Sequence, residues 1–314
     1  MNEKSFQEYL EKNFPFLNGI GIGDDAAVIN KADKNSQLIT KDILIENTHF
    51  KMDYFSMGEL AQKAIAVNLS DIAAMGGIPE YFFLGLGMPK IYQKKIIPFF
   101  EGIKDSCQFF NISLGGGDYS SSALFFISVT MIGKCKNPIL RSNAQTGDYI
   151  CITKNPGESA LGLELLKLKK ENTMTKEELY FTEKHKFTVP ELIKGQTLSN
   201  YANSMLDISD GLIKDLNRIL SASKKGAIIY YEKLPISNSF KKVCNTYNFN
   251  EEEIVLGGGE DYGLLFTISK EQEKSLKQQD IEYTVIGEIQ ENEILSIIKN
   301  KQELEIKHSG WDHF

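Results

Sequence analysis

The chain has 314 residues, of which 42% are hydrophobic and 25% charged; this is the composition of a globular protein and excludes a disordered or fibrous one. Its formal net charge of -7 argues against a protein that binds a nucleic-acid backbone, because such proteins usually carry a basic face. This length exceeds the usual size of one hydrophobic core, so we expect roughly two domains.

The cysteines and the apolar segments predict where the protein resides. Residues 1–14 lack the apolar core of a signal peptide, and no later stretch is long and apolar enough to span a bilayer. We therefore predict a cytoplasmic protein. The cysteines are widely separated and form no CxxC pair, which favours neither a zinc site nor a disulfide framework and fits a reducing cytosol: Cys107, Cys135, Cys151 and Cys244.

The first third of the chain predicts two helices and the strands between them. Aromatic and aliphatic residues at helical spacing predict a short amphipathic helix over residues 2–14. The β-branched residues of 37–50 predict one or two strands, with Asp42 within or beside them. Ser56 and Glu59 have the spacing of a capping box, and the apolar pattern that follows predicts a helix that stops at the glycines of 74–77.

Two apolar runs, 81–88 and 123–133, have the pattern of buried strands. They flank a predicted helix over about 91–109 and a predicted GGGD turn, so two strand-helix-strand units are expected. Turn formers and charges dominate residues 134–148, which we take as the candidate domain boundary.

The second half alternates helices and strands in the same way, and the fold class is therefore α/β or α+β in two domains. The lysine- and glutamate-rich stretch of 167–186 is expected to be a solvated helical face. We predict strands at 149–153, 227–231, 263–268 and 283–289, a helix that starts near Ser159, and a helix that follows DISDG and runs through Leu220.

Six short segments place aspartate beside glycine, serine or lysine. Carboxylates on such turns are suited to hard cations, and several of them together would repel one another unless an ion such as Mg²⁺ neutralised them. Mg²⁺ in turn favours phosphate oxygens as further ligands. The segments are GIGDD (Asp24, Asp25), TKD (Asp42), NLSD (Asp71), GGGD (Asp118), DISDG (Asp207, Asp210) and GGGED (Asp261).

Each of these segments also has a simpler interpretation when it is taken alone. The glycine runs at 115–117 and 257–259 are typical of tight turns, and Ser209 with Asp210 could cap the helix that follows. DISDG does not begin an EF-hand, because Arg218 stands where that loop needs a glutamate. P-loop, protein-kinase and Rossmann motifs are absent from the sequence. Independent turns would not explain all six segments.

Taken together, the segments resemble the thiamine-monophosphate kinase family, a branch of the superfamily that includes aminoimidazole ribonucleotide synthetase and selenophosphate synthetase. The resemblance covers essentially the whole chain, and its motifs occur in the family's order. They are GIGDDAAV, TKDILIENTHF, KAIAVNLSDIAAMGGIPE, GGGD, RSNAQTGD, NPGESALGL, DISDGLIKDL, LGGGEDYGLLFT, IGEI and GWDHF.

The resemblance implies a two-domain aminoimidazole ribonucleotide synthetase-like fold. Residues 1–136 would form an N-terminal domain that binds ATP and Mg²⁺ and whose sheet pairs with that of a second subunit in a barrel-like homodimer core. Residues 137–314 would form a C-terminal α/β domain that completes the nucleotide and substrate site.

The resemblance also implies roles for individual residues, with Asp42, Asp71, Asp118 and Asp210 as the catalytic group. ATP would contact Gly117, Asp118, Arg141 and Ser209. Thiamine monophosphate would be recognised by His49, Glu260 and Trp311, although a lone histidine or a terminal tryptophan is also common as a packing residue. Several Mg²⁺ ions would be held by Asp25, Thr40, Asp42, Asp71, Asp118, Asp207 and Asp210.

Two residues depart from the family's pattern. Tyr119 stands where a small hydroxyl residue often follows the GGD segment, and Lys41 precedes the strand aspartate where a small or neutral residue is common. If that second position serves the metal through its backbone carbonyl, lysine is tolerated, and we favour this interpretation.

The implied reaction is direct phosphoryl transfer from ATP to thiamine monophosphate, giving thiamine diphosphate and ADP. A phosphate monoester has a second pKa of about 6, so the acceptor is mostly a dianion and needs no strong general base. The alternatives are a sister activity of the same superfamily, or a non-catalytic metal- or nucleotide-binding relative. The absence of a reactive cysteine or glycine-rich arm near the N-terminus disfavours selenophosphate synthesis, and the intact aspartates argue against loss of turnover.

Overall fold

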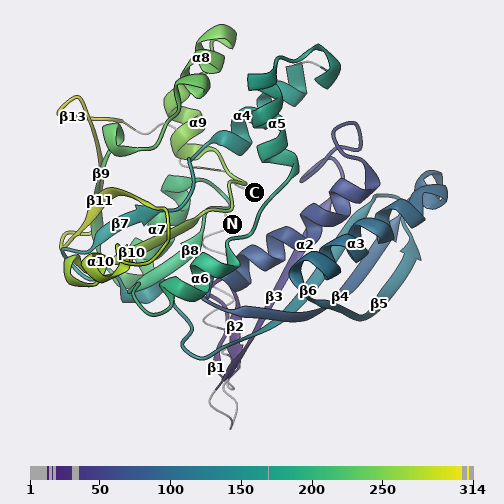
Figure 1. Ribbon diagram of the computed structural model, residues 1–314, viewed down its shortest axis with the longest axis horizontal. Coiled ribbons are helices and arrows are strands. Elements are labelled where there is room, and N and C mark those ends of the chain that lie inside the picture. Colours follow the sequence, from purple (N-terminus) through teal and green to yellow (C-terminus); the bar gives the residue numbers. More distant parts are fainter. Residues whose placement is uncertain are drawn as a thin grey trace.

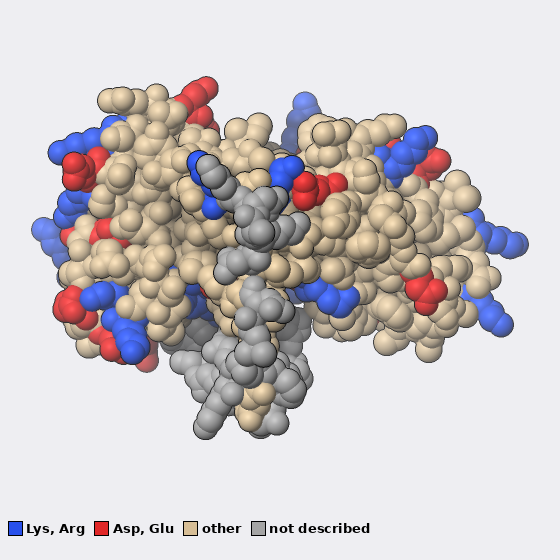
Figure 2. All heavy atoms as spheres, turned by 90° about the horizontal axis from the view of Figure 1, so that it is seen from below, with Lys and Arg blue, Asp and Glu red and all other residues tan. Residues whose placement is uncertain are grey.

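Two open β-sheets with their helices make up the computed structural model, which describes residues 13, 16, 19–29, 35–168, 170–305 and 310 (Figure 1). The helix predicted over 2–14, apart from residue 13, and the residue Trp311 lie outside the described residues. In the part that the structure covers, no helix is long and apolar enough to cross a membrane. On the face seen in Figure 2, basic and acidic side chains are mixed over both halves of the molecule.

The first sheet has six strands in the order β1-β2-β3-β6-β4-β5, and the helices α2 and α3 lie over one of its faces (Figure 1). β6 pairs antiparallel with β3 and β4, whereas β4 and β5 are parallel on either side of the crossover through α3. Both predicted strand-helix-strand units are thus confirmed. The elements are β1 (Gly19–Ile20), β2 (Ala27–Ile29), β3 (Ser36–Ile45), α2 (Met57–Ala74), β4 (Ile78–Met88), a 3₁₀ helix (Lys90–Lys95), α3 (Ile96–Phe110), β5 (Ser113–Ser121) and β6 (Phe126–Cys135).

The helix α2 begins at the predicted capping box: the Ser56 side chain accepts from the Glu59 backbone N–H, and the Glu59 carboxylate accepts from the Ser56 backbone N–H. Fourteen of its 18 residues are buried, which explains why its sequence is mostly apolar and has no broad polar face. A helix of this kind needs a protein surface on both flanks. Residues from Met57 to Ile72 belong to the hydrophobic cluster of the first sheet, and Ala73 and Ala74 at the end of the helix belong to a cluster with the second sheet.

The GGGD segment is a strand and not a turn, so this prediction was wrong. Residues 115–118 lie inside β5, which pairs in parallel with β4. The glycines are needed for strand packing: a Cβ on Gly117 would lie 1.9 Å from the Leu84 carbonyl oxygen. Every residue of β5 is exposed, and it is an edge strand of the sheet as described.

The second sheet has seven strands in the order β13-β12-β9-β11-β7-β10-β8, and helices pack on both of its faces. One face carries α4, α7, α8 and α9, and the other carries α6, α10 and the end of α2. All four predicted strands are confirmed. The elements are β7 (Tyr149–Ile152), α4 (Glu158–Leu168), α5 (Lys176–Lys186), α6 (Leu192–Leu198), β8 (Ser204–Asp207), α7 (Leu212–Ser223), β9 (Gly226–Tyr230), α8 (Asn238–Tyr247), α9 (Glu251–Gly257), β10 (Leu264–Ile268), α10 (Lys270–Leu276), β11 (Thr284–Gln290), β12 (Leu295–Lys299) and β13 (Gln302–Glu303), with short 3₁₀ turns at Arg141–Asn143, Glu171–Thr173 and Tyr231–Lys233.

The lysine-rich stretch differs from the expectation of a purely solvated face. α5 buries Phe181 in the hydrophobic core beside the second sheet, and His185 near the end of α5 is only 2% exposed. The fold class is therefore the predicted mixed α/β arrangement around two sheets, with α2 seated between them. Neither sheet closes into a barrel within the described chain.

Candidate active site

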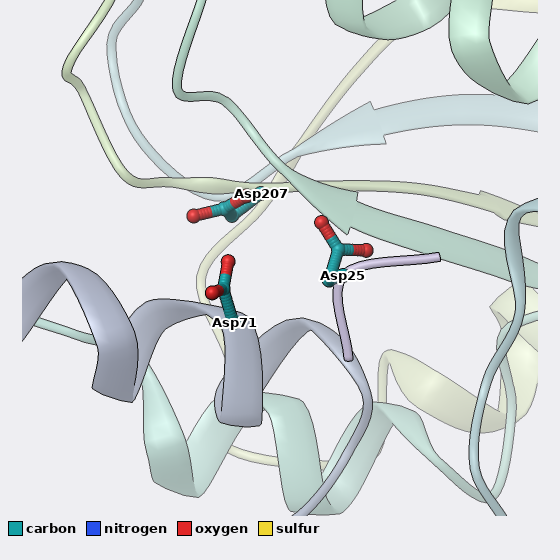
Figure 3. A group of neighbouring side chains, drawn as sticks. All are labelled: Asp25, Asp71 and Asp207. Carbon is teal, nitrogen blue, oxygen red and sulfur yellow. The ribbon is translucent and has the colours of Figure 1, made fainter. Parts of the chain in front are cut away.

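Three aspartates from three different elements converge where α2 meets both sheets (Figure 3). Asp71 lies near the end of α2, Asp207 is the last residue of β8, and Asp25 precedes β2. Oxygen atoms of the three carboxylates lie within 4.8 Å of one another. Asp207 shares a sheet face with Met205, and this is the face on which the end of α2 packs. The topology therefore brings these sequence-distant carboxylates together.

Hydroxyl groups hold two of these carboxylates in place. Ser70 donates a hydrogen bond of 2.6 Å to Asp207 Oδ2, and Thr40 donates to Asp71 Oδ2. Thr40 and Asp42 are two residues apart in β3 and therefore lie on the same face of the strand. This is the face that α2 covers, so both side chains point toward the helix. Predicted residues from four segments of the chain are thus gathered in one place.

The carboxylates are crowded enough to disfavour their charged forms. Burial, followed by the neighbouring charges of Asp42, Asp207 and Asp25, raises the pKa of Asp71 well above its usual value. Burial and the Asp25 charge likewise raise the pKa of Asp207, and they raise the pKa of Asp42 to about 6. Asp25 Oδ2 is buried and has no hydrogen-bond partner. Like charges around an unpartnered oxygen fit a hard divalent cation.

Arg141 balances one of these charges. Its guanidinium forms an ion pair of 2.8 Å with Asp25 Oδ1 and donates to the Gly23 carbonyl at 3.0 Å. Its backbone N–H donates to Asp24 Oδ1 at 2.8 Å, which gives Asp24 a structural role. The predicted nucleotide contact Arg141 therefore lies directly behind the carboxylate cluster. Its Nε is a buried donor without an acceptor.

The DISDG loop is shaped by an aspartate that we did not single out from the sequence. Asp215 Oδ2 accepts from the backbone N–H groups of Ser209, Asp210 and Gly211 at 2.9 to 3.1 Å, so it caps the start of α7. The alternative in which Ser209 or Asp210 caps this helix was wrong. Asp210 instead pairs with Arg218 and, at 3.3 Å, with Lys214.

The GGGED loop packs directly against DISDG. Glu260 N–H donates to the Ser209 carbonyl at 2.7 Å, and a Cβ on Gly259 would lie 2.4 Å from that same oxygen. Asp261 turns away and accepts from the backbone N–H groups of Gly157 and Ser159 at the start of α4, which is a structural role. Glu260 faces the other way, toward a cavity.

This cavity has a volume of about 620 Å³ and reaches from the aspartates to Glu260. A volume of this order accommodates a small-molecule ligand. Six of the predicted site residues line it: Asp42, His49, Asp71, Ser209, Asp210 and Glu260. His49 Nδ1 accepts from the Ile45 backbone N–H at 3.1 Å, which orients its ring.

Two predicted residues, Gly117 and Asp118, do not join this group within one chain. Asp118 pairs with Gly85, Gly85 with Ser128 and Ser128 with Ile43, so these four residues share one face of the first sheet. Asp42 lies on the opposite face, and three strand spacings of roughly 14 Å separate β5 from β3. The Asp118 carboxylate is thus turned away from the cluster.

Four residues of this region were missed in the sequence: Lys63, His185, Asp215 and Arg218. A lysine inside a largely apolar helix was the available signal for Lys63, because a buried ammonium requires partners. His185 carried no such signal, because its stretch is rich in charged residues.

The fold and the acidic site together define a class. A family model described as AIR synthase related protein, N-terminal domain, matches residues 23–135, and one described as AIR synthase related protein, C-terminal domain, matches residues 145–300. The chain thus has the two-part architecture of the AIR synthase related proteins.

Relatives and solved structures narrow this class. The thiamine-monophosphate kinase of Buchnera aphidicola subsp. Schizaphis graminum is 40% identical over 94% of this chain and 92% of its own length, and that of Escherichia coli K12 is 33% identical over the same shares. The structure of AaThiL complexed with AMPPCP and TMP is 32% identical, covers 100% of this chain and 97% of its own, and superposes with a TM-score of 0.90. Thiamine monophosphate kinase from Aquifex aeolicus is 30% identical over 98% of this chain and 100% of its own, with a TM-score of 0.84. The chain belongs to the thiamine-monophosphate kinase family.

Proposed function

We propose that this protein transfers the γ-phosphoryl group of ATP to thiamine monophosphate, with Mg²⁺, and forms thiamine diphosphate and ADP. The observation that carries the proposal is the cluster of Asp25, Asp71 and Asp207, whose member Asp71 lines a cavity of ligand size together with Asp42. The AaThiL structure, which binds an ATP analogue and TMP, matches the whole chain and supports this choice of substrates.

The residues fit a group of Mg²⁺ ions. Bound Mg²⁺ would neutralise the phosphates and hold the donor and acceptor in line. Asp25 Oδ2 offers an unpartnered oxygen, while Ser70 and Thr40 fix the orientation of Asp207 and Asp71. Asp210 already has cationic partners and would contribute at the periphery. The proposed ligand set remains Asp25, Thr40, Asp42, Asp71, Asp118, Asp207 and Asp210.

The chain supplies positioning and not a strong base. The acceptor phosphate is mostly dianionic near neutral pH, so its own oxygen can attack. His185, at the wall of the cavity, stays neutral because burial, followed by the charge of Lys63, lowers its pKa to about 3. Ser209 and Arg141 would contact the nucleotide phosphates. Arg141 is suited to this role because its guanidinium lies beside Asp25 and its Nε has no acceptor.

The acceptor would occupy the end of the cavity that His49 and Glu260 line. Glu260 is suited to a heterocycle with a positive charge or an amino group. Trp311 stays a proposed contact, and Trp311→Ala is expected to raise the KM for thiamine monophosphate. An unchanged KM would assign this residue to packing.

A homodimer is part of the proposal, because one chain does not bring Asp118 to its own cluster. The open face of the first sheet exposes Ile43, Phe83 and Phe126, each at least 36% accessible, and β5 is exposed along its whole length. Apolar faces and unpaired edge strands are typical of surfaces that a second copy covers. We propose that residues 1–136 form this dimer in a barrel-like core, that residues 137–314 complete each site, and that Asp118 and Gly117 reach the partner's nucleotide.

Mixing two inactive variants tests this arrangement. Asp118→Asn and Asp71→Asn homodimers are each expected to be inactive. If Asp118 acts across the interface, random mixing restores about a quarter of wild-type activity, because half of the dimers then hold one intact site out of two. Mixtures that stay inactive, although mass measurements with one variant isotopically labelled show exchanged dimers, would place Asp118 in its own chain's site.

The activity itself is tested by incubating the protein with ATP, Mg²⁺ and thiamine monophosphate and measuring thiamine diphosphate. If calorimetry shows that ATP binds but no thiamine diphosphate forms, the protein is a non-catalytic relative that binds nucleotide. Rapid-quench sampling distinguishes the route, since a kinetically competent phosphoprotein would exclude direct transfer.

The predicted cytoplasmic location is kept in the proposal, supported by the four cysteines, which are free thiols.

A further inference from the structure

Lys63 is a charged residue in α2, a helix of which 14 of 18 residues are buried. Only 1% of its surface is exposed, yet it lies in α2 among apolar neighbours. Its ammonium group donates to the His185 carbonyl at 2.8 Å and to Glu260 Oε2 at 3.1 Å, and it lies 5.3 Å from the centre of the Phe55 ring. A buried ammonium is stable only when it is paired and hydrogen-bonded in this way. The pair joins the helix α2 to the GGGED loop of the second unit.

His185 contacts the same carboxylate. Its Nδ1 lies 3.2 Å from Glu260 Oε2 and 3.2 Å from Ser159 Oγ. A carboxylate only accepts, so its closeness favours the tautomer of His185 with the proton on Nδ1, for which the Ser159 hydroxyl oxygen is the recorded hydrogen-bond partner. Lys63 thus hydrogen-bonds Glu260 Oε2, and His185 Nδ1 lies against the same oxygen.

The backbone of Glu260 is constrained as well. Its φ angle is 63°, in the left-handed region that few residues other than glycine adopt, and its N–H is bound to the Ser209 carbonyl. Glu260 nonetheless lines the cavity. With Oε2 taken by Lys63 and His185, the carboxylate has Oε1 left to offer to a ligand.

We infer that Lys63 and His185 are positioning residues for the acceptor substrate: Lys63 hydrogen-bonds Glu260 Oε2 and His185 packs against the same oxygen, and together they fix the carboxylate so that Oε1 accepts a hydrogen bond from an amino group of the substrate's heterocycle. This inference rests on the proposed function, because thiamine monophosphate supplies that amino group on its pyrimidine ring. Lys63 does not touch the substrate in this arrangement and acts through Glu260.

Steady-state kinetics with each substrate varied in turn tests the inference. Lys63→Met keeps the length of the side chain and removes its charge. We expect the KM for thiamine monophosphate to rise by about tenfold or more and the KM for ATP to change by less than about twofold. Lys104→Met is the matched control, since Lys104 is exposed on α3 and pairs only with Glu101 across 3.7 Å among the contacts described. An equal rise of both KM values, or a loss of kcat alone, would overturn the inference.

A double variant separates positioning from a general structural effect. Glu260→Gln is expected to raise the same KM, and Lys63→Met with Glu260→Gln is expected to be no worse than Glu260→Gln alone, because both act on one contact. This pair also remains informative if Lys63→Met alone folds poorly, since the double variant leaves no unpaired buried charge. Additive losses would show that Lys63 acts elsewhere.

A substrate analogue provides a readout that a structural role would not move. Thiamine monophosphate with an oxo group in place of the pyrimidine amino group lacks the donor for Oε1. Wild-type protein is expected to favour the amino substrate in kcat/KM by tenfold or more, and Glu260→Gln and Lys63→Met to lose most of that preference. A preference that persists in both variants overturns the inference. Failure of wild-type protein to form thiamine diphosphate would instead refute the proposed function.

Discussion

Two charged groups on the helix α2 differ in how their charges are balanced. Around Asp71, several carboxylates from both sheets face one another, and one guanidinium, that of Arg141, pairs with one of them. Around Lys63, eight residues earlier and about 12 Å along the helix, an ammonium, a neutral imidazole and one carboxylate compensate each other. In the proposed function Mg²⁺ completes the first group, whereas the second is balanced by charges of the protein alone. The first is built to bind, and the second to hold a side chain in place.

The largest expected effect is the loss of turnover in Asp71→Asn. An amide in place of this carboxylate removes a central ligand of the proposed Mg²⁺ group, and we expect kcat to fall by roughly 10³-fold or more while the protein remains folded. Turnover at saturating substrate and far-ultraviolet circular dichroism measure the two parts. Asp105→Asn, on the exposed face of α3, is the control. Near-normal activity of Asp71→Asn at low Mg²⁺ would contradict the proposal that the carboxylates around Asp71 bind Mg²⁺.

The response of stability to Mg²⁺ should depend on pH. The pKa values of Asp42, Asp71 and Asp207 are raised in the folded state, to about 6 for Asp42. Raised carboxylate pKa values stabilise the fold below the unfolded value near 4, and this contribution is lost as pH rises through the folded values. Mg²⁺ then replaces the lost protons. We expect Mg²⁺ to raise Tm by several degrees at about pH 7.5 and by less at about pH 5.5.

Asp71→Asn provides the control for this measurement, because it should shrink the response to Mg²⁺ at the higher pH. Lys63→Met should leave the response unchanged, since the group around Lys63 is balanced without a metal. An equal Tm shift at both pH values would show that the carboxylates are already ionised in the metal-free protein.

Asp261 tests a third way of holding a buried carboxylate, by backbone N–H groups. Burial raises its pKa to about 7 even though Gly157 and Ser159 donate to it. Its contribution to the free energy of unfolding is therefore fully present below about pH 4 and lost as pH rises to about 7, and it amounts to at most on the order of 4 kcal/mol. Urea unfolding of wild type and Asp261→Asn across this range measures the difference. A difference that stays constant with pH would mean that Asp261 is ionised throughout.

Sequence reasoning was most successful where the signal was local. The capping box at Ser56, the buried strands and the helix after DISDG all appear in the structure because period and turn chemistry report neighbouring residues. It was wrong for GGGD because the close approach that excludes a Cβ at Gly117 comes from Leu84, more than thirty residues away. A triple glycine indicates that another backbone segment comes close to it, but the sequence alone does not identify that segment.

The candidate site also shows that residue types were predicted better than long-range contacts. The aspartate segments predicted a hard-cation site, and Asp25, Asp42, Asp71 and Asp207 do converge. The opposite faces of Asp42 and Asp118 became visible only through the strand register. Lys63 and His185 were not recognised because their partner, Glu260, lies 197 residues from Lys63 and reaches it across two units. Long-range pairs of this kind leave no period in the sequence.

The smallest expected effect comes from Ser56→Ala, which removes the cap at the start of α2. Loss of a serine cap costs about 1 kcal/mol, which corresponds to a fall in Tm of about 3 °C for a domain of this size. Lys63 lies seven residues after the cap, two turns into the helix, where burial on all sides holds the backbone. We therefore expect the KM for thiamine monophosphate to stay within about twofold of wild type. If that KM rises in step with the fall in Tm, the start of α2, and not the contacts with His185 and Glu260, fixes the position of Lys63. The group of Lys63, His185 and Glu260 would then depend on the cap of α2, just as the proposed Mg²⁺ site around Asp71 depends on its cation.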